Sequence, residues 1–372
     1  MPRPPGIAAS TGEISGAVFS PIADKMRAAP GGVCPLHVGD TWMEPFVGGR
    51  MEDLRVVEYP GMHRYCETRG LPELIDALVA KLRARNGLAV ERENVLVTGG
   101  ATAGLGAAVA TLADPGDEVL VLAPFWPLIR GIVQTFRAVP VEVPFFDVVR
   151  SAADAVAAVA ERATPRSVAL YVSTPSNPTG RTIPKPWLEA LAEWARSTGL
   201  WLLSDEVYED YVYRGAHVSI AQFAPERTLS AFSFSKAYGM AGNRTAYLTG
   251  PAELVAQAQK IGTHTAYHAP TAGQLAAIRA LAQGADWVAE ARESYREVGD
   301  ETARRLGHPT PEGGQFHFLD LRDSLDERGI WGFLGDCVDD GVALAPGPSF
   351  GQSYEAKDGR GSASRLRPRT KC

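Results

Sequence analysis

Between residues 95 and 203 short apolar runs alternate with amphipathic segments, and this alternation constrains the fold more than any other feature of the chain. The apolar runs are 95–98, 118–122, 139–143, 167–172 and 200–203. Helical patterns lie between them, at 101–113, 128–136, 152–162 and 185–197. Continuous apolar runs of this length suit strands that are buried on both faces. Because strands that alternate with helices form parallel sheets covered on both sides, we predict an α/β fold around a mostly parallel sheet.

Further segments continue the pattern toward both ends of the chain. Strands are predicted at 229–234, 245–248, 316–321 and 342–344, and helices at 71–87, 251–306 and 324–338. The mixture of helix and strand after residue 306 predicts a smaller α+β unit. At 372 residues the chain has room for about two domains. We expect an N-terminal arm and part of a small domain in 1–45, a large domain in 46–280, and a C-terminal small domain in 281–372.

The composition narrows the class of partner. A net charge of −6 and a pI near 5.7 argue against nucleic acid or an anionic membrane as the main partner. No apolar run approaches the ~20 residues that span a bilayer, and the first residues lack the apolar core of a secretory signal. The four cysteines include no CxxC pair, so we expect no metal site. We therefore expect a cytoplasmic protein that acts on small molecules.

Lys236 is the strongest candidate for a reactive group. It follows the strand at 229–234 within Ser233-Phe-Ser-Lys236-Ala-Tyr-Gly-Met-Ala-Gly-Asn-Arg244. Burial lowers the pKa of an amine, and a neutral amine can form a Schiff base with an aldehyde. Arg244 offers a fork of donors to a phosphate. Together these residues indicate pyridoxal 5′-phosphate (PLP) as cofactor; the alternative is a surface lysine behind an edge strand.

Other polar residues also follow predicted strands, at the edge where open parallel sheets bind ligands. The turn Thr98-Gly-Gly-Ala-Thr102 joins a strand to a helix, and its backbone N–H groups can hold an anion, although such turns are common. Asp205 follows the strand at 200–203. Its carboxylate can hold a proton on a pyridine nitrogen, or it can simply cap a helix.

Four more residues have two interpretations each. Tyr208 can donate to the cofactor's phenolate oxygen or pack with a satisfied hydroxyl. Asn177, in Ser173-Thr-Pro-Ser-Asn177-Pro-Thr-Gly180, can donate to the same oxygen or serve only the turn. Trp126 can stack on a ring or belong to the core. Tyr65, in His63-Arg-Tyr-Cys66, is either a ligand or an exposed aromatic side chain.

These motifs resemble those of the fold-type I PLP enzymes, specifically the class I/II aspartate and aromatic aminotransferases. SFSKAYGMAGNR is similar to the family's lysine motif, and SDEVYEDYVY and STPSNPTG are similar to its Asp and Asn motifs. The resemblance extends from about Gly31 to Tyr354. It implies a large domain that binds PLP and a small α+β domain built from both ends of the chain.

The resemblance also implies a role for each residue. Lys236 would form the Schiff base and move the substrate proton, Asp205 would keep the pyridine nitrogen protonated, and Asn177 and Tyr208 would hydrogen-bond the ring oxygen. Trp126 would stack on the ring. The phosphate would be held by Ala101, Thr102, Ser233 and Arg244. Tyr65 would reach the phosphate of a neighbouring subunit, which predicts a homodimer, and Gly39, in Leu36-His-Val-Gly-Asp40, would lie beside the substrate.

The reaction that the motifs favour is transfer of an α-amino group from an amino acid to a 2-oxo acid. A PLP-dependent lyase, cyclase or oxidase of specialised biosynthesis uses the same fold and lysine, so it remains the alternative. A regulatory or binding module without catalysis is a third possibility, and the presence of Lys236 argues against it. Trp42, Met43 and Arg64 are further candidates near the substrate, and they leave acidic and apolar side chains open.

The C-terminal tail departs from the family pattern. After Pro346-Gly-Pro-Ser-Phe-Gly351 the family requires an arginine that begins an apolar strand and binds the substrate α-carboxylate. Residues 356–372 are instead basic and nearly free of large apolar side chains, and Arg360 or Arg365 is the substitute candidate for that arginine. Codons compatible with 360–368 encode Arg-Leu-Cys-Phe-Thr-Ala-Ala-Pro in a neighbouring frame. We hypothesise that a frameshift produced this tail; the alternative is a disordered basic tail.

Overall fold

A seven-stranded sheet forms the centre of the computed structural model, which describes residues 6–14, 20–321 and 324–354. Within those residues the strand order is β2-β8-β7-β6-β5-β3-β4. The strands are β2 (Val95–Thr98), β3 (Glu118–Ala123), β4 (Val139–Pro144), β5 (Ser167–Ser173), β6 (Trp201–Asp205), β7 (Thr228–Ser233) and β8 (Ala246–Thr249). Only β8 runs antiparallel to its neighbours β2 and β7, so the predicted mostly parallel sheet is confirmed.

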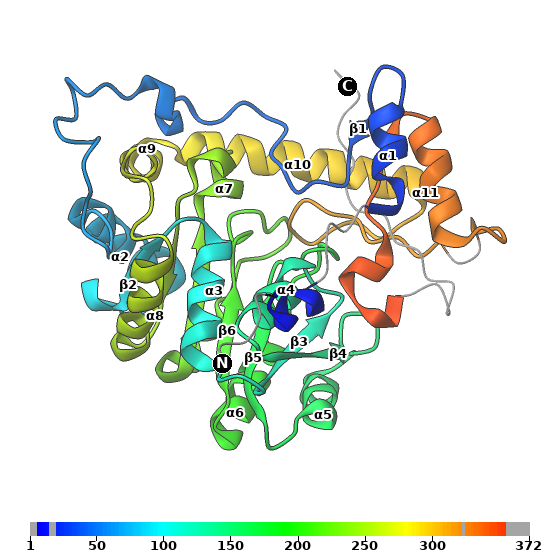
Figure 1. Cartoon of the computed structure of the whole chain (residues 1–372), viewed down its shortest axis with the longest axis horizontal. Helices are drawn as coiled ribbons and strands as arrows, with labels where there is room; N and C mark the ends of the chain where they lie inside the picture. The colour runs from blue at the N-terminus through cyan, green and yellow to red at the C-terminus, as the bar shows by residue number, and fades with distance from the viewer. Residues whose placement is uncertain (1–5, 15–19, 322–323, 355–372) are drawn as a thin grey trace.

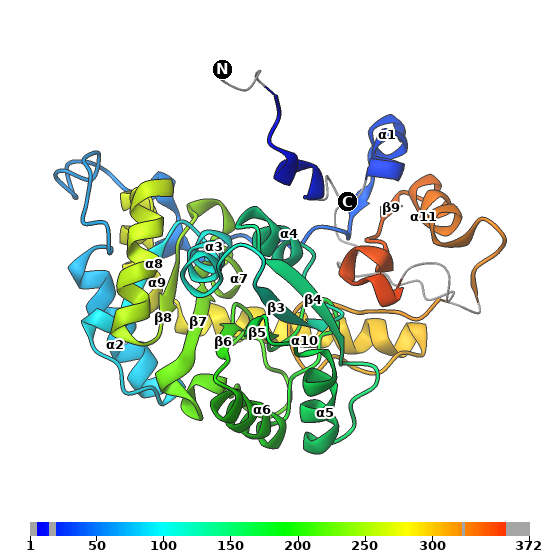
Figure 2. The same ribbon diagram turned by 60° about the horizontal axis from the view of Figure 1, so that its bottom comes forward.

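Helices cover both faces of this sheet (Figures 1 and 2). They are α2 (Pro72–Asn86), α3 (Ala101–Leu112), α4 (Leu128–Thr135), α5 (Ala152–Arg162), α6 (Lys185–Thr198), α7 (Phe234–Ala237), α8 (Ala252–Thr265), α9 (Thr271–Gln283) and α10 (Ala285–Leu306). Of the helices in the described residues, none combines the length and the apolar character that crossing a membrane requires.

Successive side chains of each strand pack against different layers, because a strand's side chains alternate between faces. In β3, Val119 and Val121 pack with α3, α4 and α8, whereas Leu120 and Leu122 pack with α5 and α6. Helices α2 and α9 cover the part of the second face formed by β2, β7 and β8. The strands are therefore apolar on both sides, as the uninterrupted apolar runs in the sequence predict.

The ends of the described chain pack together outside the central sheet. Helix α1 (Ser20–Ala28) contacts α11 (Gly329–Asp339), and β1 (Cys34–Pro35) pairs in parallel with β9 (Val342–Ala343). Ile22 from one end shares an apolar cluster with Ile330, Leu334 and Val338 from the other. Domain boundaries near residues 45 and 280 remain a prediction.

Most predicted elements lie within two residues of the observed ones, and the exceptions have local causes. The helical stretch 251–306 divides into α8, α9 and α10, with Pro270 before α9 and Gly284 before α10. Helix α11 begins at Gly329, five residues later than predicted. The predicted strand at 316–321 is wrong: no segment of the described chain pairs with it, and a strand needs a neighbour for its ladder of hydrogen bonds.

Candidate active site

The carboxyl ends of four parallel strands and the start of α3 open onto one pocket of about 380 Å³. The strand register brings these ends together, because Ser173 of β5 pairs with Asp205 of β6, and Asp205 pairs with Ala231 of β7. The pocket lies on the face of the sheet that α3 and α4 cover. Ten predicted residues line it: Gly39, Ala101, Thr102, Trp126, Asn177, Asp205, Tyr208, Ser233, Lys236 and Arg244.

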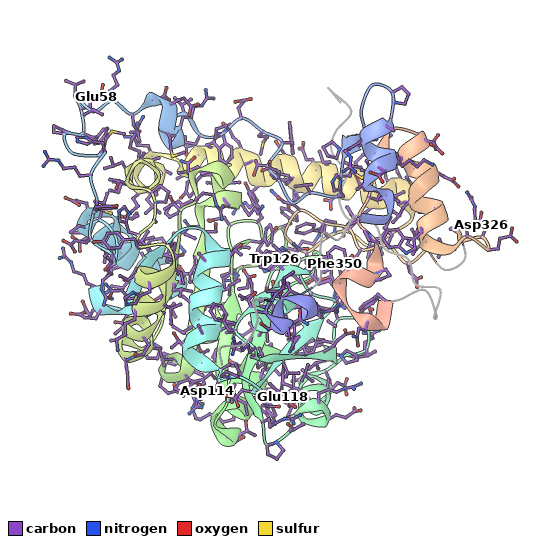
Figure 3. All side chains as sticks on the ribbon, viewed as in Figure 1. Glu58, Asp114, Glu118, Trp126, Asp326 and Phe350 are labelled. Atoms are coloured by element: carbon purple, nitrogen blue, oxygen red, sulfur yellow. The ribbon has the colours of Figure 1, made fainter. Side chains whose placement is uncertain are left out.

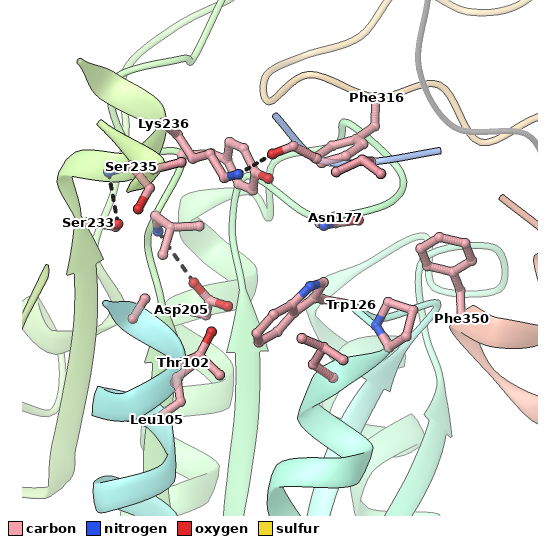
Figure 4. A pocket seen from close by; sticks show the side chains of 18 of the residues that line it. Thr102, Leu105, Trp126, Asn177, Asp205, Ser233, Ser235, Lys236, Phe316 and Phe350 are labelled. Atoms are coloured by element: carbon pink, nitrogen blue, oxygen red, sulfur yellow. Dashed lines mark hydrogen bonds between the residues drawn. The ribbon is translucent and has the colours of Figure 1, made fainter. Parts of the chain in front are cut away.

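Among the described residues that line the pocket, Asp205 supplies the one carboxyl group, and its pKa is raised. It is buried at the end of β6, and loss of solvent raises its pKa from 3.8 to about 6. Two donors limit the rise. The Tyr171 hydroxyl donates to Oδ2 at 2.6 Å, and the Val207 amide donates to Oδ1 at 3.4 Å, the bond drawn at Asp205 in Figure 4. A buried carboxyl in this state gains most from a cationic N–H group placed beside it.

The start of α3, another part of the pocket wall, suits an anion. Helix α3 begins there after Gly100, and its first turn carries no acidic side chain to occupy the free N–H groups. The guanidinium of Arg244 lies against this turn, where Nη2 donates to the Gly99 carbonyl at 3.4 Å. A Cβ at residue 100 would overlap that guanidinium, and Gly100 also has φ of +93°. Only glycine therefore lets Arg244 and the helix start share one anion.

Lys236 lies on α7, directly after β7, and its side chain is half-buried in the pocket. Its amine donates a hydrogen bond to the carbonyl of Gly39, which joins two segments that are 197 residues apart in sequence (Figure 4). Ser233 caps α7, since its hydroxyl accepts from the Ser235 amide at 3.0 Å. The cap fixes the direction in which the short helix presents the lysine.

Asn177, Trp126 and Tyr208 complete the wall around Lys236 and Asp205 (Figure 4). Within the described residues the buried Oδ1 atom of Asn177 has no hydrogen-bond partner, so the amide is poised for a ligand group in the pocket. Trp126 is partly buried against the core cluster under α3 and α4. The Tyr208 ring meets Phe316 edge to face, with 5.3 Å between ring centroids.

The pocket residues fit PLP on the observations above. The buried Asp205 suits a protonated ring nitrogen, and the α3 turn with Arg244 suits a phosphate. The unpaired Oδ1 of Asn177 is an acceptor, so only the Nδ2 group of this residue could donate to a ring oxygen.

Two predicted site residues are not placed in this pocket. Tyr65 is 83% exposed and lies in a shallow depression with Met62, His63, Arg64, His268 and Thr271, where its ring packs 4.9 Å from that of Tyr267. Arg360 lies outside the described residues, as does Arg365. Trp42, Met43 and Arg64 do not line the pocket either; Trp42 packs on Tyr295, with 6.3 Å between ring centroids.

Sequence reasoning missed Tyr171 and several polar and apolar residues of the pocket wall. Tyr171, which donates to Asp205, lies two residues before Ser173 on β5 and so shares its face. That alternation is a signal that the sequence contains. His37, Val38, Leu128, Phe316 and Phe350 also line the pocket. They come from distant loops and helix starts, where no periodic pattern identifies them.

A second buried carboxylate, Glu206, directly follows Asp205 but points to a different set of partners. Its Oε2 lies 2.7 Å from Nε2 of His217 and its Oε1 accepts from the Ser219 hydroxyl at 2.8 Å. Burial alone would raise the pKa of Glu206, but the bonds to His217 and Ser219 hold it below its usual value. Burial alone would lower the pKa of His217, but the hydrogen bond to Glu206 and its negative charge raise that pKa above its usual value. This ion pair anchors the loop that begins at Asp205.

Comparison with known families extends this description to almost the whole chain. The family model described as aminotransferase class I and II matches residues 50–364. A probable aspartate/prephenate aminotransferase from Thermus aquaticus is 36% identical over 304 residues, which cover 78% of this chain and 77% of that protein. An arginine–pyruvate transaminase from Pseudomonas aeruginosa is 34% identical, over 86% of this chain and 82% of that protein.

Solved structures show the same fold. Aspartate aminotransferase from Thermus thermophilus, solved with maleate, superposes with a TM-score of 0.87 at 29% identity, covering 97% of this chain and 95% of that one. N-succinyldiaminopimelate aminotransferase from Mycobacterium tuberculosis gives a TM-score of 0.86 at 28% identity, with the same coverage of both chains.

Proposed function

Because this chain belongs to the class I and II aminotransferases and is a PLP-dependent amino-acid aminotransferase, we propose that it transfers the amino group in the pocket around Lys236. One observation carries this proposal. The amine of Lys236, the buried carboxyl of Asp205 and the start of α3 at Ala101 and Thr102 come from separate segments and line the same cavity. The amino donor is an amino acid and the acceptor is a 2-oxo acid.

The ends of the pocket hold and orient the cofactor. PLP, when bound, supplies an aldehyde that joins to amino groups and a ring that draws electrons from the adjacent carbon. Asp205 would hold a proton on the ring nitrogen, since its buried carboxylate is stabilised by a neighbouring positive charge. The phosphate would be bound by Ala101, Thr102, Ser233 and Arg244. Trp126 would pack on the ring, and the ring oxygen would accept from Asn177 Nδ2 and the Tyr208 hydroxyl.

Lys236 has the catalytic role. Its amine takes the proton from the substrate α carbon and returns it to a neighbouring atom, which is general acid–base catalysis by a group that is already in position. The hydrogen bond to the Gly39 carbonyl holds the amine at the mouth of the pocket beside the place proposed for the substrate. Half-burial limits the access of water to the amine during the transfer.

An absorption spectrum of the purified enzyme tests these roles. We expect the visible band of the bound cofactor to disappear when an amino acid alone is added and to return with a 2-oxo acid. Lys236→Ala should abolish both changes. Lys260→Ala, which removes an exposed lysine bonded only to Gln257 among the contacts described, is the matched control and should leave both intact. A lyase, cyclase or oxidase would instead turn over without a 2-oxo acid, and an unresponsive spectrum would contradict the proposal.

We also propose that the enzyme is a homodimer in which Tyr65 serves the pocket of the neighbouring subunit. The support is a pair of exposed aromatic rings: Tyr65 is 83% exposed and packs on Tyr267, which is 46% exposed. Exposed apolar surface that gathers in one place often marks a protein–protein interface. Light scattering measures the mass in solution, and a monomeric mass at working concentration would refute the dimer. Cytoplasmic localisation is a further proposal, which cell fractionation tests.

Arg360 stays a prediction for the substrate α-carboxylate. The frameshift hypothesis concerns the same tail, and it is tested by sequencing the encoding DNA and weighing the intact protein. A mass that matches an in-frame gene for residues 1–372 would refute the frameshift.

A further inference from the structure

We infer that this enzyme prefers amino donors with apolar or aromatic side chains over acidic ones, an inference that rests on the proposed function. Once the residues proposed for the cofactor are set aside, the rest of the pocket wall is largely apolar. Its main members are Val38, Pro127, Leu128, Phe316 and Phe350, with His37 and Ser235 as polar neighbours.

These apolar side chains line the pocket from four separate segments of the chain, and Figure 4 shows two of them, Phe316 and Phe350. Phe316 and Phe350 are buried, at 4% and 5% exposure, and are held in place by other rings: Phe316 packs on Tyr208, and Phe350 on Phe318 with 5.7 Å between centroids. The backbone of Phe350 is also fixed, since its carbonyl accepts from the Phe125 amide at 2.9 Å. The two rings therefore form a rigid wall rather than a mobile surface.

The rim of the pocket is apolar but still accessible. Val38 is 46% exposed and Leu128 is 50% exposed. Binding is favoured when a ligand covers large apolar side chains and so removes them from water. The carboxylate of an acidic donor offers no apolar surface that could cover them. Leu128 is the first residue of α4, so its position is set by a helix that packs on the core through Ile129 and Val133.

Charge leads to the same preference. Among the described residues that line the pocket, the lysine and arginine side chains are Lys236 and Arg244, and both have proposed roles toward the cofactor. Arg130, near the pocket in sequence, does not line it: its guanidinium stacks 5.2 Å from the Phe125 ring centroid and pairs with Glu142 at 3.8 Å. A carboxylate of an acidic donor would be desolvated against aromatic rings, which disfavours it strongly.

The first test compares donors in single-turnover reactions of the holoenzyme, followed through the cofactor's visible band. We expect kcat/KM for phenylalanine, leucine and methionine to exceed that for aspartate and glutamate at least about a hundredfold, the range that pocket contacts of this kind produce. If no amino acid changes the band, the proposed function fails. If acidic donors react fastest, the proposed function stands and the inference is refuted. Loss of that reaction in Arg64→Ala would then assign the specificity to the depression that Arg64 shares with Tyr65.

The second test locates the determinant with a matched pair of variants. Leu128→Arg adds a cation at the rim and should raise kcat/KM for aspartate relative to phenylalanine at least about tenfold. Leu306→Arg makes the same change at an equally exposed leucine at the end of α10, outside the pocket, and should leave the ratio unchanged. If the ratio of kcat/KM for aspartate to that for phenylalanine is the same in both variants, the inference that the donor side chain lies beside Leu128 is refuted.

A binding measurement provides a readout that is independent of turnover. Isothermal titration of the holoenzyme with 3-phenylpropanoate and with succinate compares two unreactive carboxylates of different polarity. We expect the aromatic acid to bind at least about tenfold more tightly and Phe350→Ala to remove most of that difference. Tighter binding of succinate would overturn the inference.

Discussion

Replacement of Asp205 by asparagine should stabilise the protein without cofactor while weakening its affinity for PLP. The carboxyl is fully buried, and desolvation is the largest cause of its raised pKa. Because the folded state holds the Asp205 proton more tightly than the unfolded state does, ionisation of this group favours unfolding. Its contribution to the free energy of unfolding therefore falls as pH rises from the usual pKa of 3.8 through about 6.

The magnitude follows from that difference. The interval between a pKa of 3.8 and one of about 6 amounts to about 3 kcal/mol at neutral pH, at 1.36 kcal/mol per pKa unit. Asparagine keeps an acceptor for the Tyr171 hydroxyl but carries no charge, so Asp205→Asn should raise the free energy of unfolding by about 1–3 kcal/mol at pH 7. At pH 5 the folded state retains most of the proton, and the gain should be about half as large.

Glu206→Gln is the matched control because the two carboxyls are adjacent and both are buried. The pKa of Glu206 is lowered, so its ionised form contributes stability above its usual range, and this stability is lost as pH falls through the folded-state pKa. Removing the charge breaks the buried pair with His217 and should cost about 3 kcal/mol at pH 7. Neighbouring substitutions that each neutralise one acid should thus change stability in opposite directions.

Urea unfolding of the apoprotein at pH 5 and pH 7, at one protein concentration, measures both effects, and titration with PLP measures cofactor affinity. The expected result for Asp205→Asn is higher stability at pH 7, a smaller gain at pH 5, and PLP affinity at least about tenfold lower, since asparagine has no negative charge to stabilise a protonated ring nitrogen. An apoprotein no more stable than the parent at pH 7, or a gain that does not shrink at pH 5, would refute the electrostatic reasoning.

Three further predictions concern single contacts. Gly100→Ala should weaken PLP binding at least about tenfold, because a Cβ there displaces Arg244 and φ of +93° disfavours alanine; a dissociation constant equal to the parent's contradicts this. Tyr171→Phe removes a donor to Asp205 and should raise the pKa of that carboxyl further, seen as a shift in the pH profile of cofactor binding. Mixed Tyr65→Ala and Lys236→Ala proteins should regain activity that neither has alone if Tyr65 serves the neighbouring pocket; an inactive mixture places it elsewhere.

Much of the fold could be predicted because its determinants are local. The apolar runs that became β2 to β8 are continuous in sequence, and their burial on both faces is what a parallel sheet requires. The predicted helical stretch 251–306 divides at Pro270 and Gly284, and both residue types are known helix breakers that the sequence displays. The helical pattern alone did not show that the breaks lie at these two residues. A local pattern could not decide whether 316–321 forms a strand, because a strand needs a hydrogen-bonded neighbour, and that neighbour is often far away in sequence.

The polar part of the site was predictable for a related reason. Ligands of a parallel sheet bind where its strands end, so Asn177, Asp205 and Lys236 could be placed on one edge from their positions after apolar runs. Residue types with distinct chemistry, such as a lysine or a glycine pair, are also recognisable in a sequence.

The sequence by itself thus determined the sheet and its polar edge, and it predicted a chemical role for Lys236, since each depends on residues close together in the chain. The tertiary structure alone decided that Asp205 is buried enough to have a pKa near 6, that Gly39 accepts from Lys236 across 197 residues, and that Tyr171 supports Asp205. It also decided which apolar side chains form the rest of the pocket. Burial and long-range contact depend on how distant segments pack, and no local pattern of residues encodes them.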